Sequence, residues 1–176
     1  MAIREAKSRP FHLEEVTTTS SPTTIAHARE LLLEYGRFVI AQPACVHFCY
    51  GSLEQEAAGL PRSFNEQGGG CLLAHVLGKP SGFVAWRTLP ASVSTLAWEL
   101  KRLWVRPSGR GLGLGRALTQ AVLDRAAAAG CKAVFLDTAP AAMDSAYRLY
   151  LQMGFVPCTP YNDNPIEELA YLVKRL

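Results

Sequence analysis

The sequence predicts an α/β fold, and one stretch in the second half of the chain carries the prediction. Residues Trp98 to Val105 are typical of a strand, which Arg106-Pro107 ends because proline removes a backbone donor. A glycine-rich turn follows, and from Leu114 apolar residues recur at the spacing of a helix packed on one face. Lys132 to Thr138 is a second, strongly apolar strand. A strand, a crossover helix and a strand form a right-handed βαβ unit, so these two strands should be parallel.

The chain before this unit predicts one strand, two helices and a hairpin. Phe11 to Val16 is expected to be the first strand. A Ser/Thr/Pro-rich loop then caps a helix that begins near Pro22 and continues to about Ile40, and a second helix covers about Ser52 to Leu60. The runs Cys71–Leu77 and Gly82–Leu89, on either side of a Gly-containing turn, predict an antiparallel hairpin.

The chain after the unit predicts a helix and two strands. The helix starts at Pro140 and ends at Gly154, with inward positions at Met143, Tyr147, Tyr150 and Leu151. Phe155 to Cys158 begins a strand, and Leu169 to Lys174 is the last one. Since neither a linker nor a repeat interrupts the pattern, we expect a single domain over residues 1–176, with residues 1–10 as a frayed lead-in.

Composition excludes several classes of protein. The chain has 176 residues, 49% of them hydrophobic, which suits a single folded core rather than a disordered segment. The net charge of +3, without a dense Lys/Arg block, does not indicate a nucleic-acid partner. No apolar run approaches the length that spans a bilayer, and the charged N-terminus does not resemble a secretory signal.

The cysteines predict free thiols. Five cysteines are scattered along the chain, an odd number, which points to a reducing compartment and a cytoplasmic location. Cys45-x-His47-x-Cys49 has ligands that could suit zinc, but a structural zinc site needs a second pair that this sequence lacks. We therefore expect no metal.

The glycine turn predicts an anion site. It comprises Arg110, Gly111, Leu112, Gly113, Leu114, Gly115 and Arg116. A helix that begins inside such a turn presents unpaired N–H groups and the positive end of its dipole, and glycine lets a phosphate approach the backbone. The dinucleotide fingerprint fails, since its third glycine would fall on Leu114 or Arg116, and the Walker ending fails at Gly115-Arg116-Ala117.

Two motifs resemble a known family. Arg110-x-x-Gly113-x-Gly115, between a strand and an amphipathic helix, resembles the acetyl-CoA signature of the GCN5-related N-acetyltransferase (GNAT) superfamily. Ala146-x-x-Leu149-Tyr150-x-x-x-Gly154-Phe155 resembles the family's second pattern. The loop Pro160-Tyr-Asn-Asp-Asn-Pro165 is similar to that of one group of small bacterial-type members.

The resemblance implies a GNAT fold, a mixed sheet of about seven strands flanked by about four helices. It also implies direct transfer of the acetyl group of acetyl-CoA to an amine, for which we favour a small molecule. The alternatives are a protein or peptide N-acetyltransferase, a non-catalytic acyl-CoA-binding module and, least favoured, another kind of nucleotide-binding protein. Dimerisation is common in the family, and nothing in this sequence fixes it.

The resemblance assigns the donor site. Backbone groups of Leu103, Trp104 and Val105 would bind the pantetheine, and the N–H groups from Arg110 to Gly115, with Arg116 nearby, would bind the pyrophosphate. Tyr150 matches the residue that protonates the leaving thiolate in many members. The asparagine that many members carry seven residues earlier is Met143 here, so that contact is missing or replaced.

The base and the acceptor site are less defined. The attacking amine must lose a proton, and the resemblance makes Glu99 the first candidate base and Asp137 the alternative. Candidates for lining the acceptor site are Tyr50, Phe64, Lys101, Arg102, Tyr161 and Asn162. Lys101 and Arg102 would suit an acceptor with a carboxylate or phosphate, or else they are an exposed pair at a strand edge.

Overall fold

A seven-stranded mixed sheet runs through the centre of the protein. The structure, a computed structural model, describes residues 10–45, 50–94, 96–166 and 168–176, so most of the predicted lead-in lies outside it. The strand order is β1-β2-β3-β4-β5-β7-β6. The strands are β1 (Phe11–Val16), β2 (Gly70–Val76), β3 (Lys79–Thr88), β4 (Ala97–Val105), β5 (Ala133–Thr138), β6 (Val156–Pro157) and β7 (Ala170–Arg175).

The pairing confirms the predicted hairpin and the βαβ unit. Strands β1 to β4 pair antiparallel in chain order, and β2 and β3 are joined by a tight turn at Leu77-Gly78. The pair β4–β5 is parallel. On the other side of β5 the sheet continues antiparallel through β7 to the short β6.

Five α-helices cover the part of the chain that the structure describes, one more than the approximate number expected. They are α1 (Pro22–Ile40), α2 (Tyr50–Ala58), α3 (Arg62–Asn65), α4 (Leu114–Ala128) and α5 (Pro140–Gln152). The additional helix is α3, a single turn that starts directly after Pro61. Proline ends a helix but is tolerated at the start of the next one, so the chain resumes helical geometry where the sequence predicts only a break.

Local signals fix the ends of the long helices. Ser21 caps α1, since its hydroxyl accepts a hydrogen bond from the Thr24 N–H at 3.0 Å, and Pro22 occupies the first turn. Two residues after α4, Gly130 has φ +80°, the left-handed conformation that favours glycine beyond a helix end.

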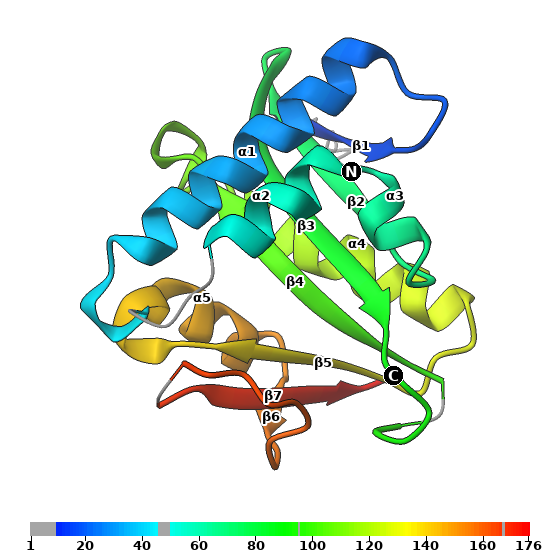
Figure 1. Cartoon of the computed structure of the whole chain (residues 1–176), viewed down its shortest axis with the longest axis vertical. Helices are drawn as coiled ribbons and strands as arrows, with labels where there is room; N and C mark the ends of the chain where they lie inside the picture. The colour runs from blue at the N-terminus through cyan, green and yellow to red at the C-terminus, as the bar shows by residue number, and fades with distance from the viewer. Residues whose placement is uncertain (1–9, 46–49, 95, 167) are drawn as a thin grey trace, which may run out of the picture.

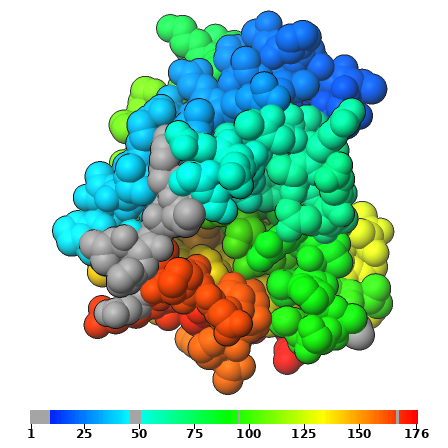
Figure 2. Space-filling view, in the orientation of Figure 1, coloured from blue at the N-terminus to red at the C-terminus, as the bar shows by residue number. Residues whose placement is uncertain are grey.

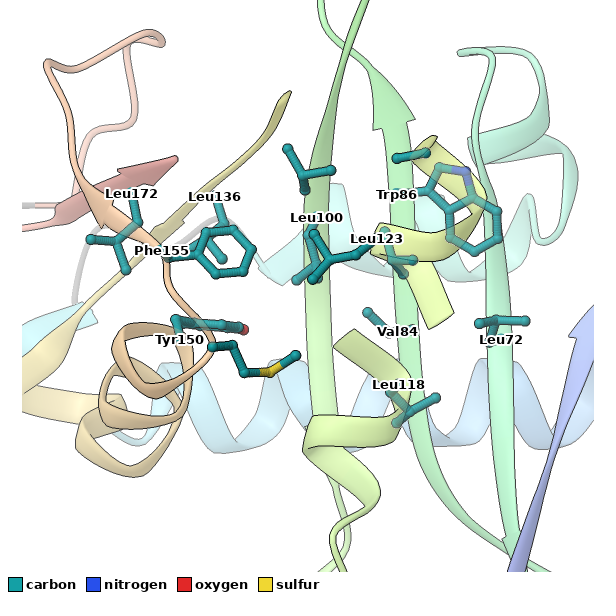
Figure 3. Close-up of a cluster of buried hydrophobic side chains, with 14 of the residues drawn as sticks. Leu72, Val84, Trp86, Leu100, Leu118, Leu123, Leu136, Tyr150, Phe155 and Leu172 are labelled. Carbon is teal, nitrogen blue, oxygen red and sulfur yellow. The ribbon is translucent and has the colours of Figure 1, made fainter. Parts of the chain in front are cut away.

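The helices divide between the two faces of the sheet (Figure 1). Helices α1, α2 and α3 pack on one face and α4 on the other, while α5 buries Tyr150 in the same cluster as α4. In β2, Cys71 and Leu73 contact the first group, and Leu72 and Ala74 the second. Both faces of the strand are buried, which explains its continuous apolar run. Figure 3 shows the cluster on the α4 side.

Helix α5 is irregular in its first half, which corrects one expectation. Met143 has the non-helical dihedrals φ −131° and ψ 44°, so the helix is kinked there. Tyr150 is buried as predicted, whereas Leu151 is 40% exposed. The prediction of Leu151 as an inward residue was wrong, because on the regular part of the helix after the kink it is Tyr150 that faces the core, and its neighbour Leu151 faces solvent.

The end of β4 is tied to α1 by a cluster of polar contacts. Glu34 of α1 accepts hydrogen bonds from the indole Nε1 of Trp104 at 3.2 Å and from the Arg106 guanidinium at 2.7 Å. Arg106 follows β4 directly and also donates to the Pro80 carbonyl. These contacts hold the start of the glycine turn against the N-terminal helix.

None of the described helices is both long and apolar enough to cross a membrane.

A substitution on α4 tests the packing of this helix on the sheet. Leu118 is fully buried in the α4-side cluster, so Leu118→Ala is expected to lower the free energy of unfolding by about 2–5 kcal/mol. Leu77→Ala is the matched control, because Leu77 is 88% exposed and its replacement should change stability by less than about 0.5 kcal/mol. Urea unfolding measures both, and equal effects would contradict the packing described.

Candidate active site

The two parallel strands separate after three residue pairs. Ala97, Trp98 and Glu99 of β4 pair with β5, whereas the rest of β4 pairs only with β3. Throughout its length β5 pairs with β7 on its other side. The backbone groups of Leu103, Trp104 and Val105 that face β5 therefore have no sheet partner within the described chain. A ligand that enters this opening finds a free strand edge to bond to.

A β-bulge lies in β4 beside the opening. Lys101 pairs with Ala85 and Trp104 pairs with Phe83, so two residues of β4 stand opposite one residue of β3. Arg102, in the bulge, has φ +60°, a left-handed conformation that costs a non-glycine residue about 1–3 kcal/mol. Such a bulge changes the direction of the strand and redirects its side chains.

The glycine turn has the geometry of an anion site. Gly111 and Gly113 have φ +79° and +80°, and a Cβ built on either would meet no atom within 4 Å. Gly113 is the N-cap of α4 and makes no side-chain cap, which leaves the first-turn N–H groups to a ligand. The Arg110 guanidinium lies over the Trp104 ring, 5.5 Å from its centroid, and Arg116 donates to the Gln152 side chain. Both arginines are exposed.

A cavity of about 310 Å³ opens between α1, α2, β4, β5 and the loop before β7. Figure 2 shows the hollow between the segments coloured teal, green and orange. A smaller recess shares six lining residues with it and continues toward Tyr150 and Leu103. The lining residues of the larger cavity include Val39, Ser52, Arg87, Lys101, Arg102, Asp137, Met143, Asn162, Asp163, Asn164, Ile166 and Leu169.

Tyr150 lies at the inner end of this hollow. Its side chain is 4% exposed and lines the smaller recess, and its ring packs edge-on against Phe155 at 5.6 Å. Figure 3 shows its hydroxyl directed from α5 toward β4. Burial raises the pKa of the phenol, so its hydroxyl stays neutral and keeps a proton that it can donate.

Glu99 is enclosed by hydrogen-bond donors rather than open to the cavity. Its side chain is fully buried. One carboxylate oxygen accepts from Arg87 Nε at 2.6 Å. The other accepts from Lys101 Nζ at 3.3 Å, from the Tyr161 hydroxyl at 3.0 Å and from Asn162 Nδ2 at 3.4 Å. Glu99 therefore joins β3, β4 and the C-terminal loop, and it does not line the cavity.

Asp137 has a different environment near the end of β5. It is half-buried and lines both the cavity and the recess beside Tyr150. One of its oxygens accepts hydrogen bonds from Asn162 Nδ2 at 2.8 Å and Asn164 Nδ2 at 3.2 Å. No lysine or arginine of the described chain pairs with it. Asp137 is therefore a carboxylate that a ligand in the cavity can reach.

The predicted acceptor-site residues fall into two groups. Lys101, Arg102 and Asn162 line the cavity. Arg102 also pairs with Glu56 at 2.8 Å and lies over the Tyr35 ring, so it is not an exposed strand-edge residue.

Two other candidates do not line the cavity. Tyr161 packs edge-on against Phe135 and Tyr171 and donates to Glu99. Phe64 is fully buried in the core beneath α1, so its assignment as a lining residue was wrong. The side chain of Tyr50 lies outside the described part of the structure.

Sequence reasoning missed Arg87 and Asn164 as residues of the site. Arg87 stands opposite Glu99 in the β3–β4 register, a relation that needs the pairing of the strands to be known. Asn164 belongs to the loop motif, but nothing in the sequence around it indicates that its side chain contacts Asp137. Met143, which the sequence analysis places where relatives carry an asparagine, lies at the kink of α5 and lines both cavities.

The cysteines and acidic residues of the described ranges offer no alternative centre. Cys45, Cys71, Cys131 and Cys158 are free, and burial raises the pKa of each thiol, that of Cys71 to about 12. Among the residues that the structure places, no His, Cys, Asp and Glu gather into a group that could hold a metal ion. His47 and Cys49 of the short metal-like motif lie outside those residues.

Comparisons with known proteins agree on one family. Residues 30–155 match the model of the acetyltransferase (GNAT) family. An uncharacterized N-acetyltransferase of Schizosaccharomyces pombe is 33% identical over 103 residues, 58% of this chain and 53% of the relative. The chain spans about half the length of the curated relatives it matches.

Solved structures show the same fold. An acetyltransferase of Streptococcus agalactiae superposes with a TM-score of 0.74 at 18% identity, covering 96% of this chain and 99% of the other. The PaiA N-acetyltransferase of Thermoplasma acidophilum, solved in complex with coenzyme A, superposes with a TM-score of 0.64 at 13% identity, covering 94% and 99%. The family match extends over most of the chain and confirms the family and the fold class that the two sequence motifs predict, so the protein belongs to the acetyltransferase (GNAT) family.

Proposed function

We propose that the protein is an acetyl-CoA-dependent N-acetyltransferase that transfers the acetyl group directly to the amine of a small molecule. One observation carries the proposal. The opening between β4 and β5 has a glycine turn at its mouth, a neutral buried tyrosine at its inner end and an accessible carboxylate on its wall. Acetyl transfer requires three such parts: one that binds the acetyl-CoA, one that protonates the thiolate and one that deprotonates the amine.

The donor would bind along the free edge of β4. Backbone groups of Leu103, Trp104 and Val105 would bond to the pantetheine arm, and the first-turn N–H groups of α4 would bind the pyrophosphate. Arg110 and Arg116 add positive charge on the same side and are exposed enough to turn toward a phosphate. The thioester would then lie in the recess beside Tyr150.

The reaction needs proton transfers at two atoms. An acceptor that arrives as an ammonium first loses one proton, because only the neutral amine nitrogen can attack the thioester carbonyl. As the C–N bond forms and the C–S bond breaks, the nitrogen loses a second proton, which balances the proton that the departing CoA sulfur gains. Tyr150 would donate that proton to the sulfur and be reprotonated afterwards. A backbone N–H of β4 near the bulge would stabilise the oxyanion of the tetrahedral intermediate.

We assign the proton acceptor to Asp137 rather than to Glu99, the first candidate from the sequence. Asp137 lines the recess together with Tyr150, and within the described chain it accepts hydrogen bonds from the amides of Asn162 and Asn164. Both oxygens of Glu99 are already occupied by donors from four residues and its side chain is fully buried. Glu99 would instead position Asn162, which bonds to both carboxylates.

The cavity favours a small acceptor over a protein. Its volume of about 310 Å³ is at the lower end of the range of small-molecule sites, and the loop over residues 162–166 forms one of its walls. A peptide acceptor would need an extended groove.

The cytoplasmic location remains a prediction. The four described cysteines, which are free thiols, support it.

Donor binding can be tested by thermal unfolding. Acetyl-CoA at a hundredfold excess over its Kd should stabilise the protein by about 2.7 kcal/mol, and NAD should not stabilise it. Gly113→Ala should weaken acetyl-CoA binding about tenfold, because alanine resists φ +80° and its Cβ would occupy the open space at the turn.

Gly51→Ala is the control for this substitution, since Gly51 is an exposed residue of α2 with no atom near its Cβ position and has no positive φ. Absence of a shift with acetyl-CoA, or an equal shift with NAD, would overturn the donor assignment.

Catalysis can be tested at Tyr150. Tyr150→Phe removes the proposed proton donor and is expected to lower kcat by about 10²- to 10⁴-fold while acetyl-CoA affinity stays within about twofold. Tyr147→Phe, one turn away on α5 and only half-buried, is the matched control and should retain kcat. A non-catalytic acyl-CoA-binding module would instead bind acetyl-CoA and show no turnover that either variant changes.

A further inference from the structure

We infer that the acceptor is an amine that also carries a carboxylate, in the manner of a free amino acid. The inference rests on the proposed acetyl transfer and concerns the charges that line the same cavity. Counted over the residues that the structure describes, the cavity has an excess positive charge on β3 and β4 and a negative charge on β5 that no cation pairs with, and a compact zwitterion supplies the counter-charge to each.

The positive charge comes from Arg87 and Lys101. Both line the cavity, and both use the same carboxylate, since Arg87 Nε and Lys101 Nζ each bond to one oxygen of Glu99. Two cations thus share one anion. The second partner of Arg87 is the neutral amide of Gln67. Among the residues that the structure describes, one positive charge at this wall is left without a counter-ion of its own, and a ligand carboxylate can supply one.

Arg102 does not contribute to this excess. It also lines the cavity, but Glu56 matches it one to one, with Nε 2.8 Å from the carboxylate, and the two side chains are 18% and 17% exposed. Of the two residues that the sequence suggests for an acidic group, Lys101, together with Arg87, is therefore a better anchor than Arg102.

The negative charge is that of Asp137. Its hydrogen-bond partners among the described residues are the side-chain amides of Asn162 and Asn164, which carry no charge. Asp163 also lines the cavity, but its side chain is exposed and solvated at the rim of the loop. An ammonium group entering the cavity is therefore drawn to Asp137, which is also where the proposed reaction needs the amine.

Asp137 lies close to the carboxylate that the two cations share. Asn162 Nδ2 lies 2.8 Å from the Asp137 carboxylate and 3.4 Å from that of Glu99, so one amide group separates the two carboxylates. Asp137 and Lys101 also line the recess beside Tyr150, whereas Arg87 lines only the outer cavity. A bound amino acid would direct its amine inward and its carboxylate outward, with its side chain against Val39, Ile166 and Leu169.

The experiment compares matched acceptors at saturating acetyl-CoA. Free amino acids of apolar, acidic and basic side-chain classes are each assayed against the amine that lacks the α-carboxylate, for example leucine against 3-methylbutylamine and against leucine methyl ester. Release of CoA gives kcat/KM. For at least one amino acid, kcat/KM should exceed that of its amine and that of its methyl ester by about tenfold or more, which is the effect of one charge-assisted contact.

Lys101→Gln then identifies the residue responsible. It should raise the KM of the preferred amino acid and reduce its advantage over the uncharged partner toward unity. Lys132→Gln, a change of the same kind at an exposed position before β5, should preserve that advantage. Even if the Lys101 variant does not fold, the wild-type comparison of the amino acid with its carboxylate-free amine decides whether the acceptor carries a carboxylate.

The outcomes separate this inference from the proposed function. Acetylation of simple amines as efficiently as of the amino acids would overturn the inference and leave the acetyltransferase proposal standing. An advantage of the amino acid that Lys101→Gln leaves unchanged would place its carboxylate elsewhere and overturn the assignment to Arg87 and Lys101. Binding of acetyl-CoA without turnover of any acceptor would overturn the proposed function, and the inference with it.

Discussion

The early end of the parallel pairing between β4 and β5 is the constraint on which the site depends. A parallel pair in an α/β sheet normally keeps its hydrogen bonds along the strand, and here they stop at the pair Glu99–Phe135. Beyond that point β4 bulges at Arg102 and turns into the glycine loop, while β5 continues along β7. The opening exposes backbone groups on one wall and Asp137 on the other, at the mouth of the βαβ unit, where α/β folds commonly bind ligands.

The buried carboxylate of Glu99 holds the base of this opening together. A buried charge is costly unless it is paired and hydrogen-bonded, and Glu99 satisfies both conditions with donors from β3, β4 and the C-terminal loop. Removing it would leave Arg87 and Lys101 beside each other without their shared anion. Its structural role also explains why a glutamate on this strand need not be the residue that takes a proton from the substrate.

The sequence predicted most of the fold because local signals agreed with each other. The glycine turn, the helix spacing from Leu114 and the apolar strand before Thr138 sufficed for the βαβ unit, and the cap at Ser21 with Pro22 fixed the start of α1. The site was predicted less completely because it depends on relations between distant segments. Arg87 meets Glu99 through strand register, Asn162 joins two carboxylates through a loop, and Phe64, an aromatic suggested for the pocket, packs in the core. Residue types and spacing cannot encode these contacts without the pairing of the sheet.

Hydrogen exchange of the backbone amides with and without acetyl-CoA tests the central claim most directly, because it reports where along the chain the donor binds. The account predicts slower exchange in two segments, residues 103–105 of β4 and residues 110–116 of the glycine turn, with little change in β1 and β2. Protection of those two segments would establish the open edge of β4 as the donor site. Binding of acetyl-CoA that protects other segments and leaves these two unchanged would contradict the account.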